Sequence, residues 1–269
     1  MKKALYRALL TVGLFFGTWY LLMQVDWVNV FRTEEATANT EEKLGDLFWE
    51  LIKKTEREYV DPYSINTVDS IVVRICKAND IERKGIRIHL LQKDEVNAFA
   101  MPGNHLVIHT GLIAEAENPE ELAGVIAHEL AHLQQNHVML KLTREIGLAT
   151  LVSMTSGGAG SELAREAIRT LSSAAFDREM EREADKVAVD YLKKAFIDPR
   201  PFADFLYRMS STDDELKRYT SWISTHPDSR ERAEIVAGYA NDFNGSEKNC
   251  LSDSTWATLK NRMLHIEEK

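Results

Sequence analysis

Near its middle the chain reads His128-Glu129-Leu130-Ala131-His132, with two histidines four residues apart and a glutamate after the first. Upstream, Asn118 and Pro119 are typical of a helix N-cap and first turn, so they predict a helix that begins here and runs past His132. Residues four apart on a helix share a face, and neutral imidazole nitrogens are good zinc ligands. We therefore expect one zinc ion (Zn2+) per chain, bound by His128 and His132. Glu129 lies next to the same point and is expected to be the catalytic base, which accepts a proton from a zinc-bound water.

A catalytic zinc site needs a third protein ligand besides an open position. Downstream, the segment from Glu179 to Asp185 has a helical pattern in which Glu181 and Asp185 share one face and Glu183 points elsewhere. We expect Glu181 to be the third metal ligand. Asp185 is expected to accept a hydrogen bond from the second ring nitrogen of His128 and so to orient that ring. Read alone, the acidic run is typical of a solvated helix face, but the metal motif beside it favours the ligand interpretation.

The N-terminus carries a hydrophobic segment, residues 8–25, without a charged side chain. Its length is what a helix needs to span a bilayer. Lys2, Lys3 and Arg7 precede it and acidic residues follow it, so the positive-inside rule places the N-terminus in the cytoplasm. We therefore predict a single-pass signal anchor that contacts the lipid bilayer through residues 8–25, with the rest of the chain in the periplasm or an equivalent compartment. A cleaved signal peptide is the alternative.

The pattern along the chain predicts three parts and an α+β, mostly helical fold. Residues 1–32 form the basic N-terminus and the anchor, residues 33–40 form a polar tether, and residues 41–269 form one catalytic domain. Short strands are expected at residues 86–91, 96–101 and 105–110, and a loop at residues 146–160. Helices are expected after Thr40, at residues 68–76, 118–132, 161–173 and 177–194, from Pro199, and at residues 228–239 and 254–266.

The composition excludes several classes of protein. With 269 residues, of which 44% are hydrophobic, the chain can bury a full core, so a disordered or fibrous protein is excluded. The net charge is −9 and the basic residues are dispersed among carboxylates, which argues against a nucleic-acid partner. Cys76 and Cys250 lack the spacing of a cysteine zinc site. Whether they form a disulfide stays open.

Three sequence blocks, in this order along the chain, carry a resemblance to a known family: Asn97–Gly103, His128–His132 and Glu181–Asp185. Together they resemble the gluzincin metallopeptidases, which include HtpX, the CAAX prenyl protease and the periplasmic BepA-like enzymes, with the BepA-like branch the most similar. The resemblance implies a zincin-type fold, a zinc metallopeptidase domain at residues 41–269, and misfolded or membrane-associated polypeptides as substrates.

In such enzymes the first block leads into an edge strand beside the cleft. The matching strand here consists of Leu106, Val107, Ile108, His109 and Thr110. An unpaired strand edge can hold an extended peptide by main-chain hydrogen bonds. We therefore expect this strand to bind substrate.

A fourth element, Thr225-His226-Pro227 with Arg232 beyond it, is similar to the His-Pro segment of the BepA-like branch. The resemblance implies that His226 approaches the zinc, either as a fourth ligand in a closed form or near the reacting carbonyl in an open form. Pro227 disfavours helical geometry in the preceding residue, so a loop is expected to present His226. His226 and Arg232 are thus candidate regulatory or transition-state residues, although His226 read alone is typical of a helix cap. No role is expected for the remaining histidines, His89, His105, His109, His137 and His265.

Two functions from different classes fit these residues. The first is a membrane-anchored metalloendopeptidase in quality control of envelope or membrane proteins, in which Glu129 assists the attack of zinc-bound water on a peptide bond. The alternative is a chaperone-like or adaptor protein whose zinc site is closed by His226 and which cleaves little. The fourth metal position discriminates between them. The substrate, the cleavage specificity and the oligomeric state are left open by the sequence.

Overall fold

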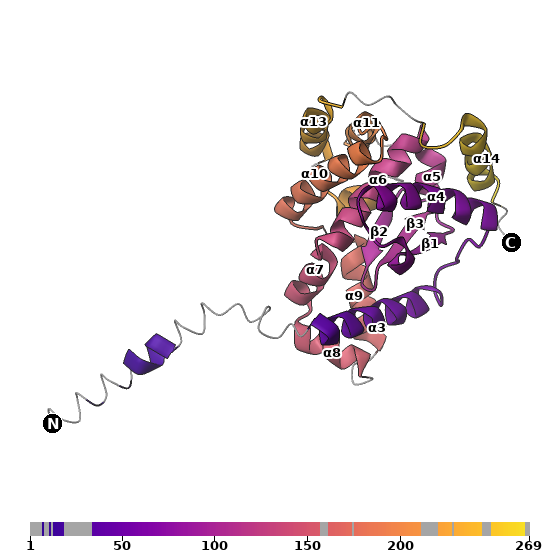
Figure 1. Ribbon diagram of the computed structural model, residues 1–269. Coiled ribbons are helices and arrows are strands. Elements are labelled where there is room, and N and C mark those ends of the chain that lie inside the picture. The colour runs from indigo at the N-terminus through magenta and orange to yellow at the C-terminus, as the bar shows by residue number, and fades with distance from the viewer. Residues whose placement is uncertain are drawn as a thin grey trace. The chain divides into compact units, whose positions relative to one another are not determined.

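The computed structural model describes residues 7, 11, 13–18, 34–156, 161–173, 175–210, 220–227, 229–243 and 249–266 (Figure 1). The chain divides into two compact units, residues 1–40 and 41–269. Most of the expected membrane anchor, residues 8–25, lies outside the described residues. Among those that are described, no helix combines the length and the apolar character that crossing a membrane requires.

Helix α3, Glu34–Ile52, begins earlier than the sequence pattern predicts. The expectation that the helix begins after Thr40 is therefore wrong, and residues 34–40 of the expected tether, residues 33–40, are helical. The physical reason is that residues 34–44 contain neither glycine nor proline. Nothing in them stops the helix that the buried side chains of Leu44, Phe48 and Ile52 stabilise.

The sheet has three strands, β1 Arg87–Leu91, β2 Ala98–Met101 and β3 His105–His109, in the order β1-β3-β2. β1 runs parallel to β3, and β2 runs antiparallel to it. Gly103 and Asn104 have positive φ angles of 68° and 59°, which suit the tight turn between β2 and β3. The three expected strands are thus present.

β3 is the central strand of this sheet, not an edge strand. It pairs with a neighbour on each side, and all of its residues are buried. The prediction that residues 106–110 offer a free edge to substrate is therefore wrong, and Thr110 belongs to helix α5 instead. The reason is the parallel pairing of β1 with β3, a contact between distant segments that the local pattern does not reveal. β2, on the other side of β3, is an outer strand of this sheet.

Helices α4, Pro62–Ala78, and α6, Pro119–Gln134, pack against each other and against the sheet (Figure 1). Helix α3 lies against one face of the sheet, because the ring of Trp49 stacks on that of His89 with centroids 3.7 Å apart. Successive side chains of a strand alternate between faces, so Leu90 points to the opposite face, where it is fully buried.

The other regular elements in the described part of the domain are helices. A short 3-10 turn, η1, covers Arg83–Gly85. The remaining helices are α5 Thr110–Glu115, α7 His137–Glu145, α8 Leu148–Thr155, α9 Ser161–Ser173, α10 Arg178–Lys194, α11 Arg200–Met209, α12 Thr220–Thr225, α13 Ser229–Ala240 and α14 Asp253–Leu264. The α+β, mostly helical fold class with a small sheet is confirmed.

The sequence predicts a loop at residues 146–160, but residues 148–155 of this stretch form helix α8. Gly147, with a φ angle of 89°, separates α7 from α8. Leu151 and Met154 of α8 are buried. Burial of these apolar side chains outweighs the weak helix propensity of the neighbouring serine and threonine residues, which is why the loop prediction fails here.

Helix α6, which carries the H-E-x-x-H motif, is fixed at its start and in its middle. Asn118 accepts a hydrogen bond from the amide of Glu121 at 2.9 Å, the predicted cap, and Arg208 donates to both carboxylate oxygens of Glu121 at 2.9 and 2.6 Å. Further along, a Cβ atom at Gly124 would lie 2.4 Å from the Cβ of Phe202 in α11. Only glycine allows α11 to approach α6 this closely.

Candidate metal centre

Helices α6 and α10 bring the two sequence motifs together. α6 presents His128, Glu129 and His132, which are all fully buried. α10 packs against α6 and presents Glu181 and Asp185, which are 1% and 0% exposed. The packing of these two helices therefore holds the five side chains together in the interior.

The donor atoms of the two histidines and Glu181 converge on one point. His128 Nε2 and His132 Nε2 lie 3.0 Å apart. Glu181 Oε1 lies 3.3 Å from His132 Nε2, and Glu181 Oε2 lies 3.5 Å from His128 Nε2. A tetrahedral zinc ion with ligands at about 2.0–2.1 Å requires donor separations of about 3.3 Å. The three donors fit such an ion.

His226 joins this group from the turn that follows α12. Its Nδ1 atom lies 3.3 Å from His128 Nε2 and 3.0 Å from Glu181 Oε1. His128, His132, Glu181 and His226 form a cluster whose ligand atoms all lie within 4.8 Å of one another. The other ring nitrogen, His226 Nε2, lies 3.3 Å from Glu129 Oε1. One imidazole thus contacts both the metal donors and the expected base.

The unsatisfied polar atoms in this cluster also fit a bound cation and water. Among the described residues, neither carboxylate oxygen of Glu129 has a hydrogen-bond partner, and neither does His226 Nε2. Buried polar atoms rarely stay unpaired, because each one loses its hydrogen bonds to water. Two imidazoles and one carboxylate are the donor types of many catalytic zinc sites.

Arg232 lies behind the cluster, on α13, and is 3% exposed. Its guanidinium donates to both oxygens of Asp185 at 2.7 Å and lies 2.6 Å from Glu181 Oε2. Burial alone would raise the pKa of Glu181, but the charge of Arg232, followed by that of His226, holds it well below its ordinary value. Arg232 therefore keeps the carboxylates of Glu181 and Asp185 ionised in the interior.

Asp185 also faces His128, the histidine that the sequence analysis paired with it. Asp185 Oδ1 lies 3.0 Å from His128 Nδ1, so Nε2 is the nitrogen that points to the metal donors. Burial alone would lower the pKa of His128, but Asp185 and Glu181 raise it to about 9. A metal ion that binds His128 therefore displaces a proton from it.

Near neutral pH Glu129 and His132 are both deprotonated, but only Glu129 then carries a charge. Burial alone would raise the pKa of Glu129, but the contact with His226 and the nearby histidines hold it below its ordinary value, so the carboxylate is ionised. Burial lowers the pKa of His132 to about 4, although Glu181 opposes this. Near neutral pH the cluster thus combines a neutral imidazole, suited to a metal, with an ionised carboxylate, suited to accept a proton.

His137 contacts the cluster at His132, although its spacing from the motif predicts no role for it. Its Nδ1 atom lies 3.0 Å from His132 Nδ1, and it is 3% exposed. A residue five positions after His132 does not share its helix face, which is why no role was expected. Asn136, in the left-handed conformation with a φ angle of 57°, ends α6 and starts α7. An asparagine at a helix end was the signal that could have revealed this change of direction.

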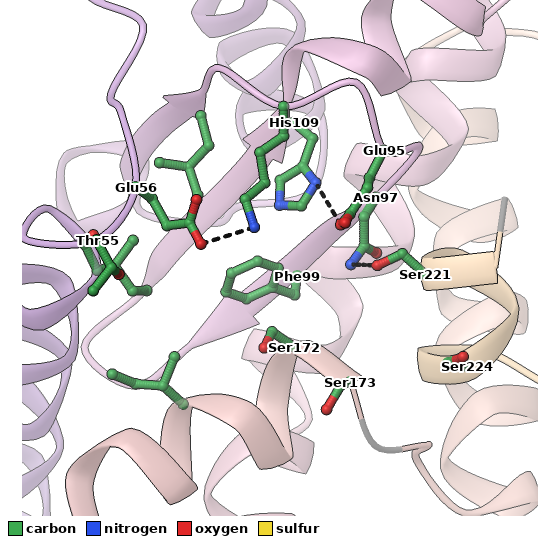
Figure 2. Close-up of a pocket in the computed structure, with 14 residues that line it drawn as sticks. Thr55, Glu56, Glu95, Asn97, Phe99, His109, Ser172, Ser173, Ser221 and Ser224 are labelled. Carbon is green, nitrogen blue, oxygen red and sulfur yellow. Dashed lines mark hydrogen bonds and ion pairs between the residues drawn. The ribbon is translucent and has the colours of Figure 1, made fainter. Parts of the chain in front are cut away.

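A cavity of about 450 Å³ lies beside the start of β2, and Figure 2 shows the side chains that line it. β2 and the residue before it contribute Phe99 and Asn97, α9 contributes Ser172, and α12 contributes Ser221. Asn97 donates a hydrogen bond to the hydroxyl of Ser221 at 2.9 Å and accepts one from Thr225 at 3.5 Å. The start of β2 is thereby tied to the segment that carries His226.

Comparison with known proteins agrees with this geometry. A family model described as peptidase family M48 matches residues 63–240, more than half of the chain. The chain belongs to peptidase family M48. The region matched to M48 contains the sheet and all four residues of the metal cluster. M48 enzymes use zinc, and the cluster of His128, His132, Glu181 and His226 can hold one such ion.

Three M48 relatives show the range of similarity. The chain is 26% identical to the beta-barrel assembly-enhancing protease of Yersinia pestis, over 71% of this chain and 43% of that protein. It is 24% identical to the mitochondrial metalloendopeptidase OMA1 of Schizosaccharomyces pombe, over 85% of this chain and 69% of that one. It is 29% identical to the metalloprotease YcaL of Escherichia coli strain K12, over 61% of this chain and 67% of that one. The chain spans less than half the length of the first of these relatives.

The resemblance to gluzincin metallopeptidases of the BepA-like branch is confirmed by these comparisons. The predicted class of enzyme, a metalloendopeptidase, is confirmed at the level of the family.

Proposed function

We propose that this chain is a zinc-dependent endopeptidase, anchored in a membrane by residues 8–25, that takes part in quality control of envelope or membrane proteins. The observation that carries the proposal is a buried cluster of three metal donors, His128, His132 and Glu181, next to an ionised carboxylate, Glu129. Donors and base lie on two packed helices, so their geometry is fixed before substrate binds.

The residues of the cluster divide the chemistry between them. Zinc held by these donors would act as a Lewis acid, which polarises a peptide carbonyl and makes water more acidic. Glu129 accepts the proton of the attacking water, because its carboxylate is ionised and lies buried beside the metal donors. Glu129 then donates this proton to the leaving nitrogen. Asp185 keeps the ring of His128 oriented throughout.

His226 holds the site closed at rest in this proposal. Its Nδ1 atom lies among the metal donors, and its Nε2 atom faces Glu129 at 3.3 Å. The ring therefore occupies the position between metal and base that the attacking water needs. Cleavage requires the segment of α12 and Pro227 to move, as mobile loops do in many enzymes.

An extended polypeptide is the proposed substrate, and we place it along the outer strand β2 rather than along β3. β2 contacts α6, and an outer strand can add a peptide as a further strand. Helix α9 also contacts β2 and has to move aside for such a peptide. A peptide that displaces the contacts of Asn97 with Ser221 and Thr225 would loosen the segment that carries His226.

The proposed topology places the N-terminus in the cytoplasm and the catalytic domain in the periplasm or an equivalent compartment. The support is the basic residues before the apolar segment, together with the names of two relatives, a beta-barrel assembly-enhancing protease and a mitochondrial metalloendopeptidase. A reporter enzyme fused after Lys269 is expected to be active outside the cytoplasm. Reporter activity inside the cytoplasm would reverse the orientation.

Casein cleavage by the zinc-loaded protein tests the proposed activity. Glu129→Gln is expected to retain one zinc ion per chain and to cleave casein about 10²–10⁴-fold more slowly than the wild type, because the ligands stay while the proton acceptor is lost. Zinc content is measured by metal analysis on the same samples. Wild-type turnover by a zinc-loaded Glu129→Gln sample would contradict the assigned mechanism.

An adaptor that rarely cleaves is the second candidate, favoured by the position of His226 among four possible ligands. It predicts that the wild type does not cleave casein at full zinc content, because His226 keeps the site closed. Casein cleavage by the zinc-loaded wild type would contradict it.

A further inference from the structure

We propose that His137 and Glu183 form a relay that orients the zinc ligand His132, as Asp185 orients His128. Both are positioning residues: they act on the metal through His132 and do not ligate it. The inference rests on the metal centre and on no assumption about which substrates are cleaved.

Two successive contacts, His132–His137 and His137–Glu183, connect the metal donors to the exposed surface of α10. His132 Nε2 faces the donors, at 3.0 Å from His128 Nε2, and His132 Nδ1 lies 3.0 Å from His137 Nδ1. His137 Nε2 lies 3.4 Å from Glu183 Oε2. The side chain of Glu183 is 54% exposed, whereas that of His137 is 3% exposed. The buried imidazole therefore connects an outer carboxylate to a buried ligand.

Metal binding would determine which ring nitrogens of His132 and His137 carry a proton. A metal at His132 Nε2 needs the lone pair of that nitrogen, so the ring carries its proton on Nδ1. Nδ1 then donates to the lone pair of His137 Nδ1, and His137 carries its own proton on Nε2. That proton points to Glu183, whose negative charge favours this arrangement. One tautomer of each ring satisfies every contact.

Helix α7 also supports the face of the His132 ring. Phe176 stacks on His132 with centroids 4.1 Å apart and an angle of 25° between the rings. The ammonium group of Lys141 lies 4.0 Å from the centroid of Phe176, on the same helix face as His137 four residues earlier. His137 of α7 thus contacts the edge of the His132 ring. Lys141 of α7 contacts Phe176, which in turn covers the face of that ring.

The test measures zinc affinity, by competition with a chelator of known affinity, on the full chain. His137→Ala removes the acceptor and is expected to weaken zinc binding about 10–100-fold. Asparagine places an oxygen where His137 has Nδ1, so His137→Asn is expected to restore most of the loss. Glu183→Gln is expected to weaken binding about two- to fivefold, the size of a half-exposed ionic contact. Glu179→Gln, an exposed glutamate of the same helix, is the matched control and should leave the affinity unchanged.

A double variant shows whether Glu183 acts through His137. In the His137→Asn background the imidazole link is gone, so Glu183→Gln should cause no further loss of affinity. The visible spectrum of the Co2+-loaded proteins should change in His137→Ala and match the wild type in Glu179→Gln, because the ligand field reports the orientation of His132.

Two results would overturn the relay. One is zinc affinity of His137→Ala within twofold of the wild type. The other is an equal effect of Glu183→Gln with and without His137. If His137→Ala does not fold, as judged by melting of the metal-free protein, the His137→Asn and Glu183→Gln measurements decide the question.

Discussion

At the scale of single residues, the imidazole of His226 is the group that, in our proposal, separates the resting from the active form. Its two nitrogens contact different parts of the chemistry, Glu181 at 3.0 Å and Glu129 at 3.3 Å. The ring also packs against Trp222, with centroids 4.3 Å apart. These contacts hold the imidazole where the attacking water would otherwise lie. Removal of the imidazole should therefore expose both Glu129 and the fourth metal position.

His226→Ala is therefore expected to raise basal casein cleavage. If the open form is a minor state of about 1–10% in the wild type, the rise is about 10–100-fold. The rates are compared at equal zinc content. His265→Ala, which changes an exposed histidine at the end of α14, is the control and should leave the rate unchanged. A fall of about 10²–10³-fold would show instead that His226 stabilises the oxyanion of the transition state.

Part of the site could be predicted residue by residue, because spacing on a helix is local information: it indicates His128, His132, Glu181 and Asp185. His226 and Arg232 are expected only from the resemblance to a known family. His128, His132, Glu181 and His226 meet in the structure, and Asp185 faces His128. Glu129 and Arg232 border the same cluster. The role of His137 could not be derived from spacing, because the left-handed Asn136 lies between it and the motif helix.

At the scale of the elements, the close packing of α6 on α11 positions the motif. Gly124 lies where these helices approach, and a Cβ atom there would meet Phe202 at 2.4 Å. The contact is with the Cβ of Phe202, which no side-chain rotation can move away. Separating the helices would also shift His128, which lies four residues further along α6.

Gly124→Ala is therefore expected to lower the free energy of unfolding by about 1–3 kcal/mol, the usual effect of an overpacked core. Gly238→Ala, in α13, is the matched control: a Cβ there meets nothing within 4 Å. The control should stabilise the protein by about 0.5–1 kcal/mol, because alanine is the better helix former. Urea unfolding of the zinc-free proteins measures both. A Gly124→Ala variant as stable as the control would contradict the close-packing argument.

Elements with caps and strong periodicity were predicted well, whereas those set by distant contacts were not. α6 and α10 have capping residues, Asn118 and Asp177, whose side chains accept hydrogen bonds from the first turns. The central place of β3 depends on its pairing with β1, and the helical form of α8 depends on burial of Leu151 and Met154. Strand pairing and burial both depend on residues distant in sequence, so the local sequence pattern does not reveal them.

At the scale of the whole molecule, the protein keeps several histidines neutral in its interior. Burial lowers the pKa of His89 to about 3, of His105 to about 4 and of His109 to about 3. All three lie on the sheet, in β1 and β3. In the unfolded chain each has a pKa of about 6.5, so the unfolded state binds more protons in acid.

The stability of the zinc-free protein should therefore fall as the pH falls from about 6.5 toward 4. Within this window each of the three histidines contributes a slope of at most about 1.4 kcal/mol per pH unit. His128, whose pKa is raised to about 9 in the folded state, opposes this trend while its unfolded form still titrates near pH 6.5, and no longer does so below about pH 5.5. Urea midpoints at pH 7, 6 and 5, with chelator present, measure the effect. Equal midpoints at the three pH values would show that these histidines titrate normally in the folded protein.

His226 belongs to the same chain as the metal donors that it contacts, so dilution cannot remove it. A group tethered in this way acts at an effective concentration on the order of millimolar or higher. Any small metal-binding compound must compete with it, and its apparent affinity falls in proportion to the fraction of molecules that are open. Every such inhibitor would thus look weaker on the resting protein by the same factor, and strong metal binders could be overlooked. Measuring them on His226→Ala would report their own affinity for the metal.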